Sequence, residues 1–264
     1  MNVKFILRGL ILAIPLAILL TLTGRLALLV GQPAEPTPLP PIILSARDTL
    51  PAGRVGLRAW ARYQGEAYHL VGSGFLLQLD DGRLVGVTTA HSVSIGDPGR
   101  PLEQIALGLQ DQTHLVVEFD TLHGHPGHAR TDLDMAVDYV LLRPLQPIDA
   151  SFVLEPDPRG GPQPGERVSL LTDMRAAESG RRILEGTVQS ANDRAVWVLM
   201  DKLFNPALMS GSPVVSQHTG RAVGMLVAGT PRRNRLLLGL NPIGSIVELA
   251  GSADEFPRLV DYEP

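Results

Sequence analysis

Residues 68–91 read "YHLVGSGFLLQLDDGRLVGVTTAH" and contain two apolar runs separated by Asp80, Asp81 and Gly82. Asp-Gly between two apolar runs is a strong local signal for a β-hairpin, because these residues readily adopt the tight turn that joins antiparallel strands. The second run ends at His91, so an apolar strand is expected to deliver an imidazole to the boundary of a sheet. This stretch therefore predicts a β fold with a histidine at a strand end.

The same pattern extends over most of the chain. Short apolar runs alternate with Gly, Pro, Asp and Asn from Ile42 to about Gly251, and only "PIGSIVELAG" at 242–251 reads as a helix. A Pro/Gly-rich stretch, "EPDPRGGPQPGE" at 155–166, divides the β region almost in half. We therefore expect an all-β fold of two six-stranded antiparallel β-barrels with a site in the cleft between them, although one long loop within a larger sandwich fits the same pattern.

The expected boundaries within the 48–254 domain are barrel one at about 48–154, a linker at 155–165 and barrel two at about 166–250, followed by a tail at 255–264.

Composition excludes several function classes. The 264 residues carry a formal net charge of −4 without a long run of one sign, so no nucleic-acid-binding surface is expected. The chain has no cysteine, which excludes disulfides, thiolate metal sites and cysteine nucleophiles. Aromatic residues make up only 5%, so the core must consist mainly of Leu, Val, Ala and Ile.

The amino-terminal segment indicates export. Lys4 and Arg8 precede the uncharged run 9–24, which as a helix spans about 24 Å, and continuing to residue 30 approaches the thickness of a bilayer core, about 30 Å. We expect residues 1–30 to form an uncleaved transmembrane signal anchor, with a cleaved signal peptide as the alternative. The Pro-rich linker at 31–47 would hold the domain away from the membrane. The domain is expected outside the cytoplasm, anchored by a single span or secreted after cleavage.

Seven histidines are present, and the densest group is "HGHPGH" at 123–128. Imidazole is a common metal ligand, but this group contains Pro126 and Gly127 and no carboxylate pattern frames it. We interpret it as a solvated loop and expect neither a metal nor another cofactor. His91 is the histidine whose place at a strand end favours a chemical role, with a boundary residue bonded to backbone as the alternative.

Three aspartates occur in "TDLDMAVDYVLL" at 131–142. Asp134 directly precedes an apolar run, which would carry its carboxylate into partial burial where it could hold a histidine N–H. Asp132 and Asp138 read as a loop cap and a residue on an exposed strand face. A surface role for Asp134 remains the alternative.

Residues 205–229 read "NPALMSGSPVVSQHTGRAVGMLVAG", with Ser210 between Met and Gly. Ser-Gly-Ser-Pro is also ordinary turn chemistry, so this string alone does not distinguish a nucleophile from a polar turn. A serine hydroxyl needs a neutral imidazole to accept its proton, and the imidazole needs a carboxylate to fix its tautomer. His91, Asp134 and Ser210 supply these groups from the two halves of the chain.

The three blocks, "GSGFLLQLDDGRLVGVTTAH", "DLDMAVDYVLL" and "MSGSPVVSQHTGRAVGM", resemble in order the signature blocks of chymotrypsin/trypsin-like serine peptidases. Bacterial high-temperature-requirement (Deg-type) peptidases are especially similar, over roughly residues 68–250. The resemblance implies a membrane-anchored serine endopeptidase that cleaves protein or peptide substrates through an acyl-enzyme. No peptide-binding (PDZ) module is expected after the domain.

The resemblance also implies roles for individual residues. His91 would be the general base, Asp134 the orienting carboxylate and Ser210 the nucleophile. The N–H groups of Leu208 and Ser210 would form the oxyanion hole. The remaining implied site residues would bind substrate, Phe204 near the base of the specificity pocket and the others as a strand that pairs with the peptide: Val227, Ala228 and Gly229.

One position departs from the family pattern, because Leu208 stands where the family usually has glycine. Glycine accepts backbone angles that a side chain disfavours, so a Leu208 N–H turned away would remove one donor and lower the rate about 10²- to 10³-fold. A catalytically weak or inactive domain that binds extended peptides is therefore the alternative function. An exported β-sandwich with coincidental motifs is the third.

Overall fold

The computed structural model describes residues 51, 54–109, 115–174 and 183–263. The expected anchor at 1–30 and the linker at 31–47 lie outside these residues. Within the described ranges, no helix is long and apolar enough to cross a membrane.

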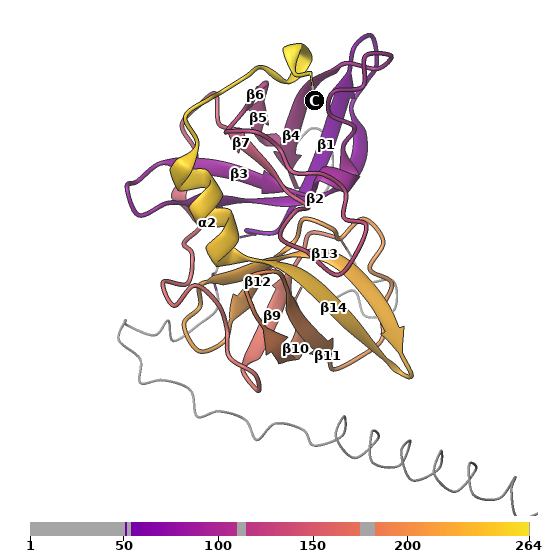
Figure 1. Ribbon diagram of the computed structural model, residues 1–264, viewed down its shortest axis with the longest axis vertical. Coiled ribbons are helices and arrows are strands. Elements are labelled where there is room, and N and C mark those ends of the chain that lie inside the picture. The colour runs from indigo at the N-terminus through magenta and orange to yellow at the C-terminus, as the bar shows by residue number, and fades with distance from the viewer. Residues whose placement is uncertain (1–50, 52–53, 110–114, 175–182, 264) are drawn as a thin grey trace, which may run out of the picture. The chain divides into compact units, whose positions relative to one another are not determined.

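The first β unit is built from an eight-stranded sheet in the order β5-β4-β1-β2-β3-β7-β6, with β8 paired in parallel to β2 (Figure 1). Its strands are β1 (Leu57–Tyr63), β2 (His69–Gln78), β3 (Leu84–Thr88), β4 (Leu102–Gly108), β5 (Leu115–Phe119), β6 (Thr121–Leu122), β7 (Val140–Arg143) and β8 (Val153–Leu154). The sheet curls into a nearly closed barrel whose end strands, β5 and β6, do not pair with each other. The prediction of six strands is wrong for this unit, because β6 and β8 are two-residue strands with no recognisable sequence pattern.

The second β unit is a closed six-stranded barrel in the order β10-β11-β14-β13-β12-β9, and all its pairings are antiparallel. Its strands are β9 (Arg167–Leu171), β10 (Ile183–Ala191), β11 (Val196–Met200), β12 (Pro213–Ser216), β13 (Ala222–Arg232) and β14 (Arg235–Pro242). The all-β, two-barrel prediction is thus confirmed, and the six-stranded form holds for this second unit.

The opening hairpin positions the two units against each other. β2 and β3 pair in the register Phe75↔Val87, as the Asp-Gly turn predicts. Successive residues of a strand point to opposite faces, and here Phe75 and Leu77 enter one hydrophobic core while Leu76 enters another. The first of these cores also contains Val215 and Met225 of the second barrel. β2 therefore forms a wall between the core of the first unit and an apolar interface shared by both.

The carboxyl-terminal part of the chain crosses from the second unit to the first. The helix α2 (Ile243–Ser252) follows β14 and buries Ile243, Ile246 and Ala250, which share one helical face. This helix was predicted from "PIGSIVELAG", and the prediction is confirmed. The segment then returns along the first unit, where the Leu259 N–H donates to the Asp120 carbonyl at 2.8 Å and the Leu259 side chain is fully buried (Figure 1).

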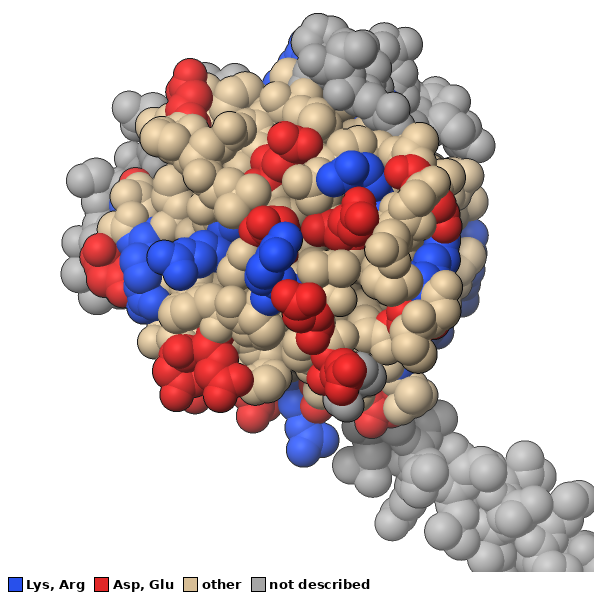
Figure 2. All heavy atoms as spheres, turned by 90° about the horizontal axis from the view of Figure 1, so that it is seen from above, with Lys and Arg blue, Asp and Glu red and all other residues tan. Residues whose placement is uncertain are grey.

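Charged residues of both signs are interspersed on the face seen in Figure 2, and no large region of that face carries one sign alone.

Candidate active site

His91 lies in a short 3-10 turn, Ala90–Ser92, that directly follows β3. Its ring Nδ1 is 2.7 Å from Oδ2 of Asp138, and its backbone N–H donates to Oδ1 of the same carboxylate at 3.1 Å. The side chain of Asp138 is fully buried, whereas that of His91 is 35% exposed. The ring is thus held from behind by a carboxylate and remains open on its other side.

The electrostatics of this pair fix the histidine tautomer. Burial raises the pKa of the Asp138 carboxyl, but the hydrogen bonds from His91 outweigh this effect, and the pKa lies below its ordinary value. An ionised carboxylate only accepts hydrogen bonds, so Nδ1 of His91 carries the proton. In the neutral ring, Nε2 is then left with a lone pair that can accept a proton.

Asp138, rather than Asp134, is therefore the carboxylate that orients His91, and the prediction for Asp134 is wrong. Oδ1 of Asp134 accepts the backbone N–H of Ala136 at 3.0 Å, as in an Asx turn, and Oδ2 lies 3.8 Å from Arg194. The strand register supplies the physical reason. Thr88 of β3 pairs with Val140 of β7, so the residues just beyond Thr88 meet those just before Val140, and these are His91 and Asp138.

Ser210 lies on the loop between β11 and β12, and this loop packs directly against the first unit. The backbone N–H of Ser73 in β2 donates to the Ser210 carbonyl at 2.8 Å, and the hydroxyl of Thr88 donates to the Ser73 carbonyl at 2.7 Å. A Cβ placed on Gly72 would lie 3.0 Å from Oγ of Ser92 and 3.1 Å from the Ser210 carbonyl oxygen, so both residues lie against β2 at Gly72. The structure therefore places the loop that carries Ser210 and the turn that carries His91 against the same part of β2.

The hydroxyl of Ser210 is not bonded to the histidine. Its Oγ donates to the Val227 carbonyl over 3.4 Å, which is a long hydrogen bond. Among the described residues, none donates to or accepts from Nε2 of His91. Since the Ser210 hydroxyl makes only this one weak contact, rotation of its χ1 angle toward the imidazole breaks only one long hydrogen bond.

The backbone before Ser210 adopts the conformation that a glycine would favour. Leu208 has φ 63°, and its carbonyl accepts the Ser73 hydroxyl at 2.9 Å. Within the described part of the chain, the N–H groups of Leu208 and Ser210 have no acceptor. Gly211, with φ 93°, is pressed against β2, because a Cβ there would lie 1.8 Å from the Ser73 carbonyl oxygen. The loop is thus packed closely against β2 and carries two free N–H groups around the serine.

A cavity of about 350 Å³ opens beside Ser210. Its lining consists of Asn205, Pro206, Ala207, Leu208, Ser210, Leu226, Val227, Ala228 and Gly229. None of these side chains is charged. The lining includes the predicted substrate-binding residues of β13 but not Phe204, which is 6% exposed and packs in the core of the second barrel. Phe204, which is expected near the base of the specificity pocket, does not itself line this cavity, and Asn205 is the first residue of the loop that does.

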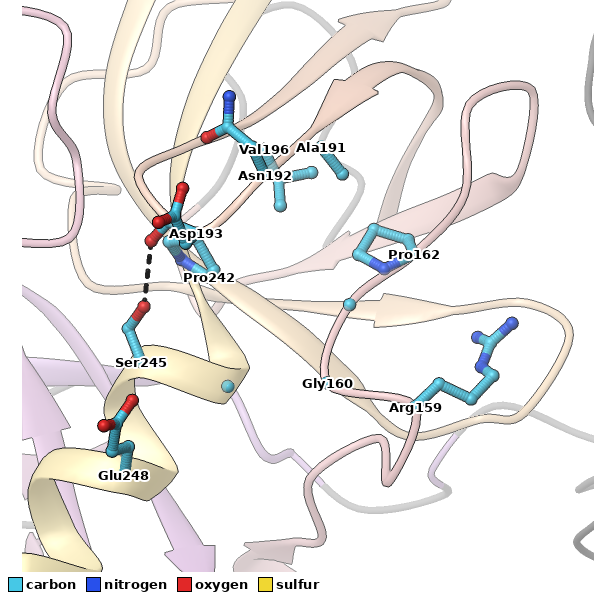
Figure 3. Close-up of a pocket in the computed structure, with 12 residues that line it drawn as sticks. Arg159, Gly160, Pro162, Ala191, Asn192, Asp193, Val196, Pro242, Ser245 and Glu248 are labelled. Carbon is cyan, nitrogen blue, oxygen red and sulfur yellow. Dashed lines mark hydrogen bonds between the residues drawn. The ribbon is translucent and has the colours of Figure 1, made fainter.

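A second cavity of similar volume contains none of the predicted site residues (Figure 3). It lies between residues 159–162, the β10–β11 turn and the start of α2, where the Ser245 hydroxyl donates to the Asp193 carbonyl at 3.0 Å. The cation on its wall, Arg159, is already bound to Asp157 at 2.6 Å and to Glu166 at 2.8 Å. This arrangement is a structural ion network.

The histidine group at 123–128 makes structural contacts. His123 is buried, its Nε2 lies 2.9 Å from the Ala250 carbonyl, and burial lowers its pKa. His125 lies 3.2 Å from Glu255. No group of three or more metal-ligating side chains occurs within the residues that the structure describes.

Comparisons with known proteins bear on the fold. No protein-family model and no curated protein matches the sequence. Among solved structures, the chain is similar to kallikrein-related peptidase 10, with 17% identity over 76% of this chain and 94% of that one and a TM-score of 0.51. A mutant of human heparin binding protein is 18% identical over 78% of this chain and 94% of that one, with a TM-score of 0.52. Catalytically active tobacco etch virus protease complexed with product is 14% identical over 84% of this chain and 87% of that one, with a TM-score of 0.50. These likenesses establish the chymotrypsin-like two-barrel fold.

Proposed function

We propose that this two-barrel domain is a serine endopeptidase in which His91 is the general base, Asp138 the orienting carboxylate and Ser210 the nucleophile. The observation that carries the proposal is the 2.7 Å contact between His91 and the buried Asp138 carboxylate, placed beside a serine loop with two free N–H groups. Solved structures with this fold include proteins named as peptidases and proteases. The placement of the side chains in this chain supports the same chemistry.

In the proposed acylation step, the Ser210 hydroxyl turns from the Val227 carbonyl toward Nε2 of His91. Its oxygen attacks the scissile carbonyl carbon while the proton passes to Nε2, and Asp138 stabilises the imidazolium that forms. The carbonyl oxygen becomes an oxyanion that accepts from the N–H groups of Leu208 and Ser210. Collapse breaks the C–N bond, and the proton on Nε2 goes to the leaving amine.

In the deacylation step, the same groups act on water. Nε2 of His91 takes a proton from a water molecule as its oxygen attacks the ester carbonyl. The second oxyanion collapses, the carboxylic acid product leaves, and the proton returns to the Ser210 oxygen. The cavity beside Ser210 has no charged side chain in its lining, so we propose a small or apolar residue immediately before the scissile bond.

A fluorophosphonate probe tests this function, because it reacts only with an activated serine. We expect labelling of the intact protein that disappears in Ser210→Ala and persists in Ser212→Ala, a matched change at a buried hydroxyl two residues away. His91→Ala should abolish labelling as well. Labelling that survives Ser210→Ala would place the nucleophile elsewhere, and turnover that survives His91→Ala would exclude His91 as the base.

A second candidate function is an inactive peptidase-like domain that binds extended peptides. The absence of a hydrogen bond between the Ser210 hydroxyl and His91 in the described residues, together with the side chain at Leu208, favours it. A folded protein that binds peptides but takes no fluorophosphonate label would support this function over the enzyme.

We further propose that residues 1–30 anchor the domain to a membrane, with the domain on the extracytoplasmic side. The charge pattern around the apolar run supports this topology. Retention of the protein in the membrane pellet after alkaline carbonate washing is the expected result, and full release would contradict an uncleaved anchor.

A further inference from the structure

One edge of β13 is unpaired over its second half. β12 pairs with β13 only as far as Met225, whereas β14 pairs with β13 as far as Arg232. Among the described strands, none other pairs with β13, so residues 227–232 have a free edge, and residues 229–232 are exposed. A free sheet edge offers N–H and C=O groups to an extended peptide, which can add to it as a further strand.

The direction of this edge relates it to the cavity. Val227 and Gly229 line the cavity beside Ser210, and the strand then runs outward to its hairpin turn (Figure 1). A peptide antiparallel to β13 with its scissile carbonyl at Ser210 therefore carries its earlier residues toward Arg232. At about 3.3 Å per residue, Arg232 is about 10 Å beyond Gly229, so it stands opposite residues at the fourth position or more before the scissile bond.

The hairpin tip is strongly basic. Arg232, Arg233 and Arg235 are all exposed, and none of them forms an ion pair with another described residue. The nearby acid is Asp201, which Arg167 already binds at 2.7 Å. Hydrogen bonds from Arg167 hold the pKa of Asp201 below its ordinary value, and Arg235 adds a smaller effect of the same sign. The positive charge of the tip is thus left without a matching acid in the described structure.

We propose that Arg232, Arg233 and Arg235 form a subsite for acidic side chains, and that the peptides recognised by this domain carry Asp or Glu at about the fourth to sixth positions before the bond at Ser210. The inference rests on the proposed function for the direction and position of the peptide. It names a substrate class for that site: extended peptides with an acidic segment followed by a small or apolar residue.

Binding to the Ser210→Ala protein tests this subsite without requiring catalysis. The probes are two fluorescent peptide pools that share two randomised positions before a fixed alanine. They differ only in the block at the fourth to sixth positions before the bond, which is three glutamates or three glutamines. We expect the glutamate pool to bind about fivefold to tenfold more tightly in fluorescence anisotropy, since each exposed ion pair contributes modestly. The preference should shrink when salt is raised to about 0.5 M.

Two charge-matched variants make the assignment specific. Changing Arg232, Arg233 and Arg235 to Gln should remove the glutamate preference while the glutamine pool binds as before. A control in which three arginines of the first unit are changed to Gln has the same loss of charge and should retain the preference: Arg83, Arg143 and Arg258.

Each outcome has a distinct meaning. Equal binding of the two pools, binding of neither pool, or loss of the preference in both variants overturns the acidic subsite. A change in the solubility of the tip variant without a change in preference also overturns it, and leaves the arginines as charges that protect an exposed edge from aggregation. A protein that prefers the glutamate pool but never takes a fluorophosphonate label keeps this inference and refutes the enzyme.

Discussion

Replacing Asp138 by Asn should abolish nearly all activity, whereas the same change at Asp134 should leave it almost intact. Both substitutions keep the size of the side chain and remove one negative charge, and the two residues lie in the same loop before β7. They differ in what the carboxylate contacts. Asp138 holds the His91 ring at 2.7 Å, and Asp134 accepts a backbone N–H two residues along its own chain at 3.0 Å.

The size of the effect follows from these contacts. The Asn side chain has one acceptor oxygen and no charge. It therefore cannot replace a carboxylate whose two oxygens accept from the ring and backbone N–H groups of His91, and it cannot neutralise the imidazolium from a fully buried position. In a Ser-His-Asp triad this change lowers kcat about 10⁴-fold, or about 5.4 kcal/mol of transition-state free energy. Asn at position 134 can still accept the Ala136 N–H, and the contact to Arg194 is 3.8 Å long and exposed. We expect less than about a threefold change there.

The assay is the second-order rate of fluorophosphonate labelling, followed together with peptide turnover at neutral pH. Urea unfolding of each variant is the control, because Asp138→Asn also weakens a buried hydrogen-bonded pair and should lower the free energy of unfolding by about 2 kcal/mol. Labelling rates should therefore be compared at temperatures where all variants remain folded. Equal losses of labelling rate in the two variants, or an Asp138→Asn protein that is labelled as fast as the wild type, would refute the assignment of Asp138 as the triad carboxylate.

Three further results are expected from the contacts that hold the loop and the linker. Ser73→Ala removes the hydroxyl that holds the Leu208 carbonyl and should lower kcat about tenfold with KM nearly unchanged; a change in KM alone would contradict this positioning role. Gly211→Ala places a Cβ 1.8 Å from the Ser73 carbonyl oxygen on a backbone with φ 93°, so the free energy of unfolding in urea should fall by about 3 kcal/mol or more. A urea midpoint equal to that of the wild type would show that the loop shifts to accept the methyl group at little cost. Burial raises the pKa of Asp157, but hydrogen bonds from Arg159 outweigh this effect, and the pKa lies below its ordinary value of 3.8. The ionised Asp157 carboxylate therefore stabilises the fold above pH 3.8, and this stabilisation is lost as the pH falls through the pKa of the folded state. The difference in unfolding free energy between wild type and Asp157→Asn should shrink below pH 3.8. A difference that grows in acid would show that folding raises the pKa of Asp157 instead of lowering it.

Local patterns predicted the parts of the fold that depend on local chemistry. The Asp-Gly turn predicted the β2–β3 hairpin and the position of His91 at its end, because strand alternation and turn preference are properties of neighbouring residues. The segment "PIGSIVELAG" predicted α2, and the structure adds that Ile243, Ile246 and Ala250 are its buried residues. The departure at Leu208 was also visible in the sequence, although only the structure shows that this residue adopts a positive φ.

The errors concern features that depend on tertiary contacts. Asp134 and Asp138 both precede apolar residues, and only the pairing of Thr88 with Val140 decides which carboxylate meets the histidine. A sequence argument that counted back from the apolar run "VLL" at 140–142 could have found Asp138. Phe204 was placed near the base of the pocket by its distance from Ser210 along the chain, and the structure adds that its ring packs in the barrel core and does not line the cavity.

The path of the chain after α2 constrains how this molecule can be divided. Residues 255–261 complete the hydrophobic core of the unit that bears His91, yet they follow the last strand of the other barrel in sequence. During synthesis, the histidine-bearing half therefore emerges well before the segment that seals it. An isolated fragment ending at the inter-barrel linker would leave an apolar gap at the place of Leu259. The two halves should mature together, so that the imidazole and the serine acquire their final surroundings in a single folding event.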